Sequence, residues 1–169
     1  MSSLNLTPTS IIVLGLVELA GEATPYAMKQ GAAASVGGFW TLQHAQFYTE
    51  PERLAAAGLL EEKRERGGRR RKLYKLTTAG AKALERWRAE PTAELTELRD
   101  PGLLKLFFGA DPRPLAEVQV EAHRSKLAEY EELRAADPGD GPRGPWLALD
   151  AGIAHAREWV RYWSKLAEE

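Results

Sequence analysis

The chain of 169 residues contains no cysteine. This absence excludes a disulfide framework, a thiolate zinc site and a cysteine nucleophile. Long apolar runs are also missing, because the apolar stretch near the N-terminus is too short to span a bilayer and no basic leader precedes it. We therefore expect a cytoplasmic protein with no membrane partner.

Patterns that carry catalysis are equally scarce. The three histidines, His44, His123 and His155, are scattered and match no metal-ligand spacing. The glycine pairs lack the flanking residues of phosphate-binding loops. We therefore predict that the protein is not an enzyme and needs no metal or cofactor.

Charge is unevenly distributed, although the net charge is only −1. Residues 1–90 hold 13 Lys and Arg against 9 Asp and Glu, whereas residues 91–169 hold 10 against 15. An asymmetry of this kind suggests that one half meets phosphate and the other does not.

The basic half centres on residues 39–80. Helix-forming residues from Gln43 to Leu54 are followed by Gly58, the residue type that favours a helix end. Residues 59–63 and 72–76 are short segments that could pair as antiparallel strands around a two-glycine turn. A helix followed by such a hairpin has the layout of a winged helix-turn-helix, so we predict a mainly α fold with a small β-hairpin wing.

The hairpin is strongly cationic, with eight basic residues and one acidic residue from Lys63 to Lys75. Neutralising phosphates supplies most of the affinity of proteins for double-stranded DNA. The alternative is a solvated turn, but solvated faces usually mix charges of both signs. The predicted wing contacts are Arg66, Gly67, Gly68, Arg69, Arg70, Arg71 and Lys72.

We predict that the start of the third helix recognises the DNA sequence, and we expect this helix to begin at about Thr41 or Leu42. Amide and hydroxyl side chains there can reach base edges or phosphates. The predicted reading residues are Thr41, Gln43, His44, Gln46, Tyr48 and Thr49. For Tyr48, core packing is an equal alternative, whereas the sequence favours core positions for Phe39, Trp40 and Trp87.

Helix starts elsewhere are marked by Thr-Pro at residues 7–8 and 24–25, with Thr as the N-cap. After the hairpin, residues 77–80 also look like an N-cap, and Glu90-Pro91 should end that helix. We place the domain boundary there, which gives a winged helix-turn-helix at residues 1–91 and a helical domain at residues 92–169.

The second half is predicted to be helical throughout. Residues 94–109 hold enough Leu and Phe for a short buried helix, and Asp111-Pro112 should start a long helix that reaches about Ala136. The last helix, from Trp146 to about Ala167, carries apolar residues at alternating spacings of three and four, as in a coiled-coil seam.

Apolar faces this wide favour packing against a second copy of the chain. The predicted dimer contacts are Leu115, Val118, Val120, Leu127, Tyr130, Trp146, Leu149, Ile153, Val160 and Trp163. Packing is the ordinary role of such an aromatic stripe. Binding of a small planar aromatic effector at Trp159 or Trp163 is the alternative.

The chain resembles the PadR family of transcriptional regulators over nearly its full length. The likeness is carried by residues 11–19, 25–26, 39–40, 46–48, 53–54, 58–60, 68–80 and 84–87, and more loosely by the C-terminal helices. It implies an N-terminal winged helix, a C-terminal helical dimerisation domain and a homodimeric repressor that releases DNA on binding an effector. It also implies phosphate contacts by Tyr26 and Lys29.

Pro51 departs from this family pattern, which has leucine at that place. Proline removes a backbone donor, so it can kink the reading helix or divide it into a break and a restart. Glu50 and Glu52 also bring negative charge close to the predicted DNA face. These three residues favour the alternative function, a winged-helix module that contacts proteins and has lost DNA binding.

Overall fold

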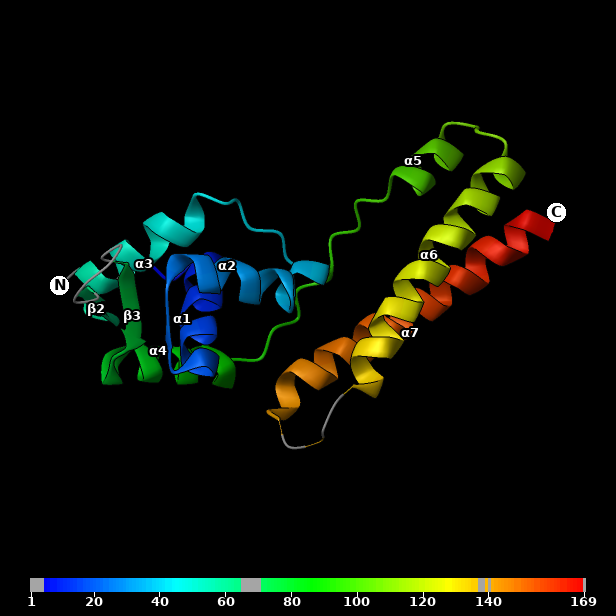
Figure 1. Cartoon of the computed structure of the whole chain (residues 1–169). Helices are drawn as coiled ribbons and strands as arrows, with labels where there is room; N and C mark the ends of the chain where they lie inside the picture. Colours follow the sequence, from blue (N-terminus) through cyan, green and yellow to red (C-terminus); the bar gives the residue numbers. More distant parts are fainter. Residues whose placement is uncertain (1–4, 65–70, 137–138, 140, 169) are drawn as a thin grey trace. The chain divides into compact units, whose positions relative to one another are not determined.

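In the computed structural model the chain divides into two compact units, Met1–Glu94 and Leu95–Glu169 (Figure 1). The structure describes residues 5–64, 71–136, 139 and 141–168. Within these ranges, no helix is both long and apolar enough to cross a membrane.

The first unit is built around α1 (Pro8–Ala20). Thr7 caps this helix and forms a reciprocal capping box with Ser10, and Pro8 occupies the first helical position. The second helix, α2 (Pro25–Ala33), starts in the same way at Thr24. Both predicted starts are confirmed, because these caps depend only on residues within one turn.

A three-stranded antiparallel sheet follows the order β1-β3-β2. The hairpin strands β2 (Leu60–Arg64) and β3 (Lys72–Leu76) pair as predicted, with Glu62 opposite Tyr74. The third strand, β1 (Glu22–Ala23), pairs with β3 and was not predicted. Two residues carry too short a pattern to be recognised as a strand.

The reading helix begins later than the sequence suggested. A short 3-10 turn, η1 (Val36–Gly38), and an irregular segment precede α3 (Gln46–Ala56), so the predicted start at Thr41 or Leu42 is wrong. The helix runs through Pro51 without interruption, and the Pro51 side chain is fully buried. Burial of the ring helps to offset the missing backbone donor, and the predicted break and restart do not occur.

The core of this unit lies where α1 meets α2, α3, the sheet and α4 (Thr78–Ala89). Phe39, Trp40 and Trp87 were predicted to lie in this core, but they are 66%, 45% and 53% exposed. Phe39 and Trp40 belong to the irregular segment, and α4 turns the small or aliphatic residues Gly80, Ala83 and Leu84 inward. Apolar character alone did not distinguish these positions.

The second unit contains α5 (Pro101–Phe107), α6 (Pro112–Ala135) and α7 (Arg143–Glu168). The helices α6 and α7 lie side by side and bury Trp163 between them with Ala116 and Val120 (Figure 1). Asp111 caps α6 as predicted, whereas α7 starts one turn before the predicted Trp146. The segment 94–109 does form a short helix, but Phe107 and Phe108 are exposed, so the prediction that it is buried is wrong for the single chain.

Candidate nucleic-acid interface

Predicted reading residues gather at the start of α3. Thr41, Gln43 and His44 lie on the exposed segment before the helix, and Tyr48 and Thr49 lie in its first turn. The rings of His44 and Tyr48 stack with centroids 5.3 Å apart. Because Tyr48 is exposed and stacked on His44, it belongs to this surface rather than to the core.

Gln46 differs from its neighbours because its side chain is already bonded within the protein. Its Oε1 accepts a hydrogen bond from the Gln43 backbone N–H at 2.8 Å, and its Nε2 donates to Thr9 Oγ1 at 3.4 Å. Ala45 provides no side-chain cap for α3, so the contact with Gln43 holds the entry to the helix. These two bonds fix the orientation of the Gln46 amide and leave one N–H and one lone pair for any contact with a base.

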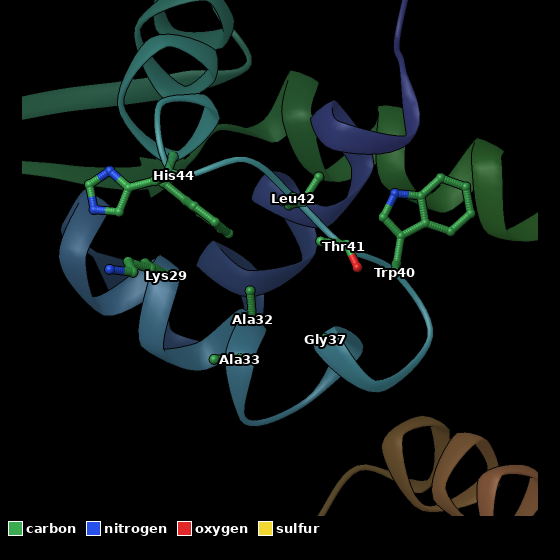
Figure 2. Close-up of a pocket in the computed structure, with 9 residues that line it drawn as sticks. Lys29, Ala32, Ala33, Gly37, Trp40, Thr41, Leu42 and His44 are labelled. Carbon is green, nitrogen blue, oxygen red and sulfur yellow. The ribbon is translucent and has the colours of Figure 1, made fainter. Parts of the chain in front are cut away.

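Three other predicted contacts line one pocket beside α2. Lys29 comes from α2, and Thr41 and His44 come from the segment before α3; the pocket has a volume of about 340 Å³. Figure 2 shows Lys29 and His44 on one side of it and Trp40 on the opposite side. The structure thus brings the second-helix cation next to the entry of α3. Tyr26 is also exposed on α2, where its hydroxyl accepts a hydrogen bond from Gln30 at 2.8 Å.

The tip of the predicted wing, Arg66, Gly67, Gly68, Arg69 and Arg70, lies outside the described residues. Arg71 is exposed at the start of the returning chain. Lys72 is half-buried, and its Nζ lies 2.5 Å from Glu52 Oε1 of α3 and 3.3 Å from Glu62 Oε2 of β2. The hydrogen bond to Glu52 does most to raise the pKa of the Lys72 ammonium group.

Glu50, the other acid of α3, faces inward and joins the reading helix to α1. Its Oε1 accepts from the buried Ser10 hydroxyl at 2.7 Å and from Arg53 Nη2 at 2.6 Å. Arg53 Nη2 also donates to Ser10 Oγ at 2.9 Å. Burial opposes the charged form of Glu50, but the hydrogen bonds from Arg53 and Ser10 outweigh it and lower the pKa of the carboxyl.

The variant Glu50→Gln is expected to lower the free energy of unfolding by about 1–3 kcal/mol at neutral pH, because it removes a charged acceptor from a largely buried network. A lowered folded-state pKa contributes stability above the ordinary value of 4.5, and this contribution is lost as the pH falls through the folded-state value. The difference between wild type and variant should therefore shrink below pH 4.5 in urea unfolding experiments. Glu61→Gln, on an exposed carboxylate, is the control. A difference that persists unchanged at pH 3 would contradict this assignment.

Sequence reasoning treated Glu50 and Glu52 only as acids near DNA and missed their structural partners. The spacing of Glu50 and Arg53 was a readable signal, because residues three apart are neighbours on a helix. No local pattern connects Glu52 with Lys72 or Glu50 with Ser10, which are separated by 20 and 40 positions.

The predicted effector and dimer residues lie in the second unit. The half-buried Trp159 ring stacks on His123 and on Trp163, with centroids 5.8 Å and 6.3 Å away, and Trp159 Nε1 donates to His155 Nε2 at 2.6 Å. Trp163, Val120 and Ile153 are already buried within one chain, whereas Val118 is exposed. The remaining predicted contacts, Leu115, Leu127, Tyr130, Trp146, Leu149 and Val160, are half-buried.

Comparisons with known proteins agree with this layout. Residues 13–86 match the model of the transcriptional regulator PadR-like family, and residues 98–169 match the model of the virulence activator alpha C-terminal family. The negative transcriptional regulator PadR of Bacillus subtilis is 26% identical, covering 89% of this chain and 90% of its own length.

Two crystal structures of Bacillus subtilis PadR share the fold. The complex with operator DNA superposes with a TM-score of 0.83 at 23% identity and covers 98% of this chain and 99% of its own. The complex with p-coumaric acid has a TM-score of 0.75 at 22% identity, with coverage of 96% and 97%.

The family match spans α1 to α4, the elements that carry the reading helix and the hairpin. The regulator relative and the two structures extend the likeness to both units. The named family, the curated relative and the two crystal structures are all of transcriptional regulators. With its three-stranded sheet and seven α-helices among the described residues, the chain shares the fold of the solved PadR structures, and its residues 13–86 belong to the PadR-like family of transcriptional regulators.

Proposed function

We propose that this regulator binds operator DNA through the entry of α3 and the cationic hairpin, and that it acts as a repressor. The observation that carries this proposal is the exposed cluster of Thr41, Gln43, His44, Tyr48 and Thr49 on the same unit as the basic strand pair. The relative of known function is a negative regulator, and its solved complex contains operator DNA. We propose that residues 1–91 form the DNA-binding domain and that the protein acts in the cytoplasm.

The test is a titration with the DNA immediately upstream of the protein's own coding region at two salt concentrations, with a scrambled duplex of equal length. Binding through phosphate contacts and base edges should prefer the upstream DNA and weaken steeply with added salt. Equal or absent binding to both duplexes at low salt would overturn the proposal for this operator.

The alternative, a winged-helix module that has lost DNA binding, rested on Pro51, Glu50 and Glu52. In the structure Pro51 leaves α3 continuous, and each acid is paired with a cation of the protein. The three residues therefore no longer favour that alternative.

We propose that residues 92–169 hold two copies of the chain together. Phe107 and Phe108 are 83% and 77% exposed, and Leu104 and Val118 are exposed on the same unit. Large apolar side chains of this kind favour an interface, and a second copy is the occupant that the closed symmetry of most homo-oligomers favours. Of the predicted seam, Val120 and Trp163 pack in one cluster and Ile153 is also buried within the chain, so the exposed group is the larger free apolar surface.

The double variant Phe107→Asp with Val118→Asp is expected to shift the protein from dimer to monomer. The dimer interface would have to bury four carboxylates, and desolvating unpaired charges is costly in free energy. Sedimentation velocity at several concentrations measures the shift. The exposed pair Glu117→Asp with Glu121→Asp on α6 serves as the control. A wild-type protein that is monomeric at all concentrations would exclude the dimer.

A planar aromatic effector is proposed for the surroundings of Trp159. The support is its half-buried ring between His123 and Trp163, together with the p-coumaric acid found in the Bacillus subtilis structure. Trp163 is fully buried, so it would be reached only if the stacked rings separate. Titration with p-coumaric acid should quench tryptophan emission in the wild type and not in Trp159→Leu; absence of quenching in the wild type would reject this ligand.

A further inference from the structure

Lys72 lies on the inner face of the hairpin. Side chains alternate between the two faces of a strand, so Lys72 shares its face with Tyr74, whereas Leu73 and Lys75 point to the opposite face. Tyr74 is fully buried in the core. Lys72 therefore lies on the side of the hairpin that faces the body of the first unit.

The contacts of Lys72 connect three elements. Its Nζ donates to Glu52 of α3 at 2.5 Å and lies 3.3 Å from Glu62 of β2. Glu62 in turn accepts a hydrogen bond from the Tyr74 hydroxyl at 3.2 Å, and Arg64 lies 3.6 Å from its other oxygen. A continuous set of polar contacts thus runs from the reading helix through Lys72 to a buried core residue.

Burial and the nearby Glu62 carboxylate raise the pKa of Tyr74 well above its ordinary value. The hydroxyl therefore remains a donor to Glu62 throughout the physiological range. Glu62 is held in turn, which fixes one of the two carboxylates that Lys72 bridges.

We propose that Lys72 is a positioning residue, which fixes the root of the wing against α3 by bridging Glu52 and Glu62, rather than a phosphate contact. It pairs with Arg64 at the end of the described ladder: Arg64 is the last described residue before the segment 65–70, and Lys72 follows that segment with only Arg71 between them. Fixing this point holds the described base of the hairpin against α3, the helix that carries Tyr48 and Thr49. Because the hairpin and the reading residues must contact the same duplex at a fixed spacing, the bridge would affect which DNA sequence the protein prefers. This inference rests on the proposed DNA binding.

The two roles predict opposite effects of Glu52→Gln. If Lys72 contacts phosphate, removing Glu52 frees the lysine and deletes a negative charge, so binding to every DNA should tighten. If Lys72 is a bridge, the variant loosens the wing root and should weaken operator binding by up to about fivefold, the upper end of the range for an exposed ion pair. Binding to scrambled DNA should stay the same or tighten slightly.

Lys72→Met extends the comparison. If Lys72 is a bridge, Lys72→Met should weaken operator binding to a similar degree and leave the salt dependence unchanged. It should also add little to the effect of Glu52→Gln in the double variant. If Lys72 is a phosphate contact, Lys72→Met should weaken binding to operator and scrambled DNA alike and reduce the slope of log affinity against log salt by about 0.9. Lys75→Met, an exposed cation on the same strand, is the matched control, and Lys72→Arg should restore operator preference.

A measurement without DNA separates this inference from the proposed function. Amide hydrogen exchange at the Lys63–Leu73 pair should be faster in Lys72→Met than in Lys75→Met, because the pair lies next to the bridge. Unchanged exchange would overturn the bridge, whether or not the protein binds the chosen DNA. If exchange accelerates but the wild type binds no DNA, the structural role of the bridge is confirmed. Its role in DNA sequence preference and the proposed binding to the upstream DNA are then both overturned.

Discussion

Replacing the wing arginines Arg66, Arg69, Arg70 and Arg71 together with alanine is expected to weaken operator binding by roughly a hundredfold to a thousandfold at moderate salt. Each arginine that neutralises a phosphate releases counterions on binding, and each lost contact removes about 0.9 from the slope of log affinity against log salt. Four lost contacts should therefore reduce that slope by about 3 to 4. Binding to scrambled DNA should fall in parallel, because phosphate contacts carry no sequence information.

The measurement is a set of binding isotherms at several salt concentrations for the wild type and the four-arginine variant. The matched control removes four exposed cations from the acidic second unit, at Lys105, Arg113, Arg124 and Lys165. Both variants lose the same net charge, so a difference between them reports position rather than overall charge. If the control weakens binding as much as the wing variant, the wing is not the phosphate-binding surface.

Trp163→Ala is expected to lower the free energy of unfolding by about 3–5 kcal/mol, the range for removing a buried aromatic ring. Trp163 is fully buried between α6 and α7, where its ring lies against Trp159 and Tyr162 with centroids 6.3 Å and 5.2 Å away. Domains of this size lose roughly 4–8 °C of melting temperature per kcal/mol, so the helical signal of the second unit should melt at least about 12 °C earlier.

Thermal melts followed by circular dichroism test this prediction. Trp163→Phe is the informative companion, because Trp163 Nε1 is buried without a hydrogen-bond partner among the described residues. Removing that N–H breaks no hydrogen bond while most of the ring remains, so the loss should be about 1 kcal/mol. Trp87→Ala, on a half-exposed ring, controls for the loss of a tryptophan as such. A loss below about 1 kcal/mol in Trp163→Ala would show that this ring does not hold α6 and α7 together.

Burial of the same ring bears on the effector. A ligand that inserts between Trp159 and Trp163 must separate rings that already stack. Such a ligand would replace one aromatic contact with two. Because Trp159 is half-buried and Trp163 is fully buried, we expect substitution of Trp159 to have the larger direct effect on ligand binding.

Local signals in the sequence were sufficient for the helix starts at Thr7 and Thr24 and for the pairing of β2 with β3. Caps and strand pairs across a short turn depend on residues close in the chain, so their chemistry is visible without a fold. The cationic hairpin was visible for the same reason.

The tertiary structure alone decided which of the charged side chains near the reading helix bind partners within the protein. Glu50 and Glu52 read as acids next to DNA, yet one is bonded to Ser10 and the other to Lys72. Phe39 and Trp40 read as core, yet they lie on the exposed segment that leads into α3. A side chain's partner can be far away in sequence, and only the packing of α1, α3 and the sheet brings such partners within hydrogen-bond distance.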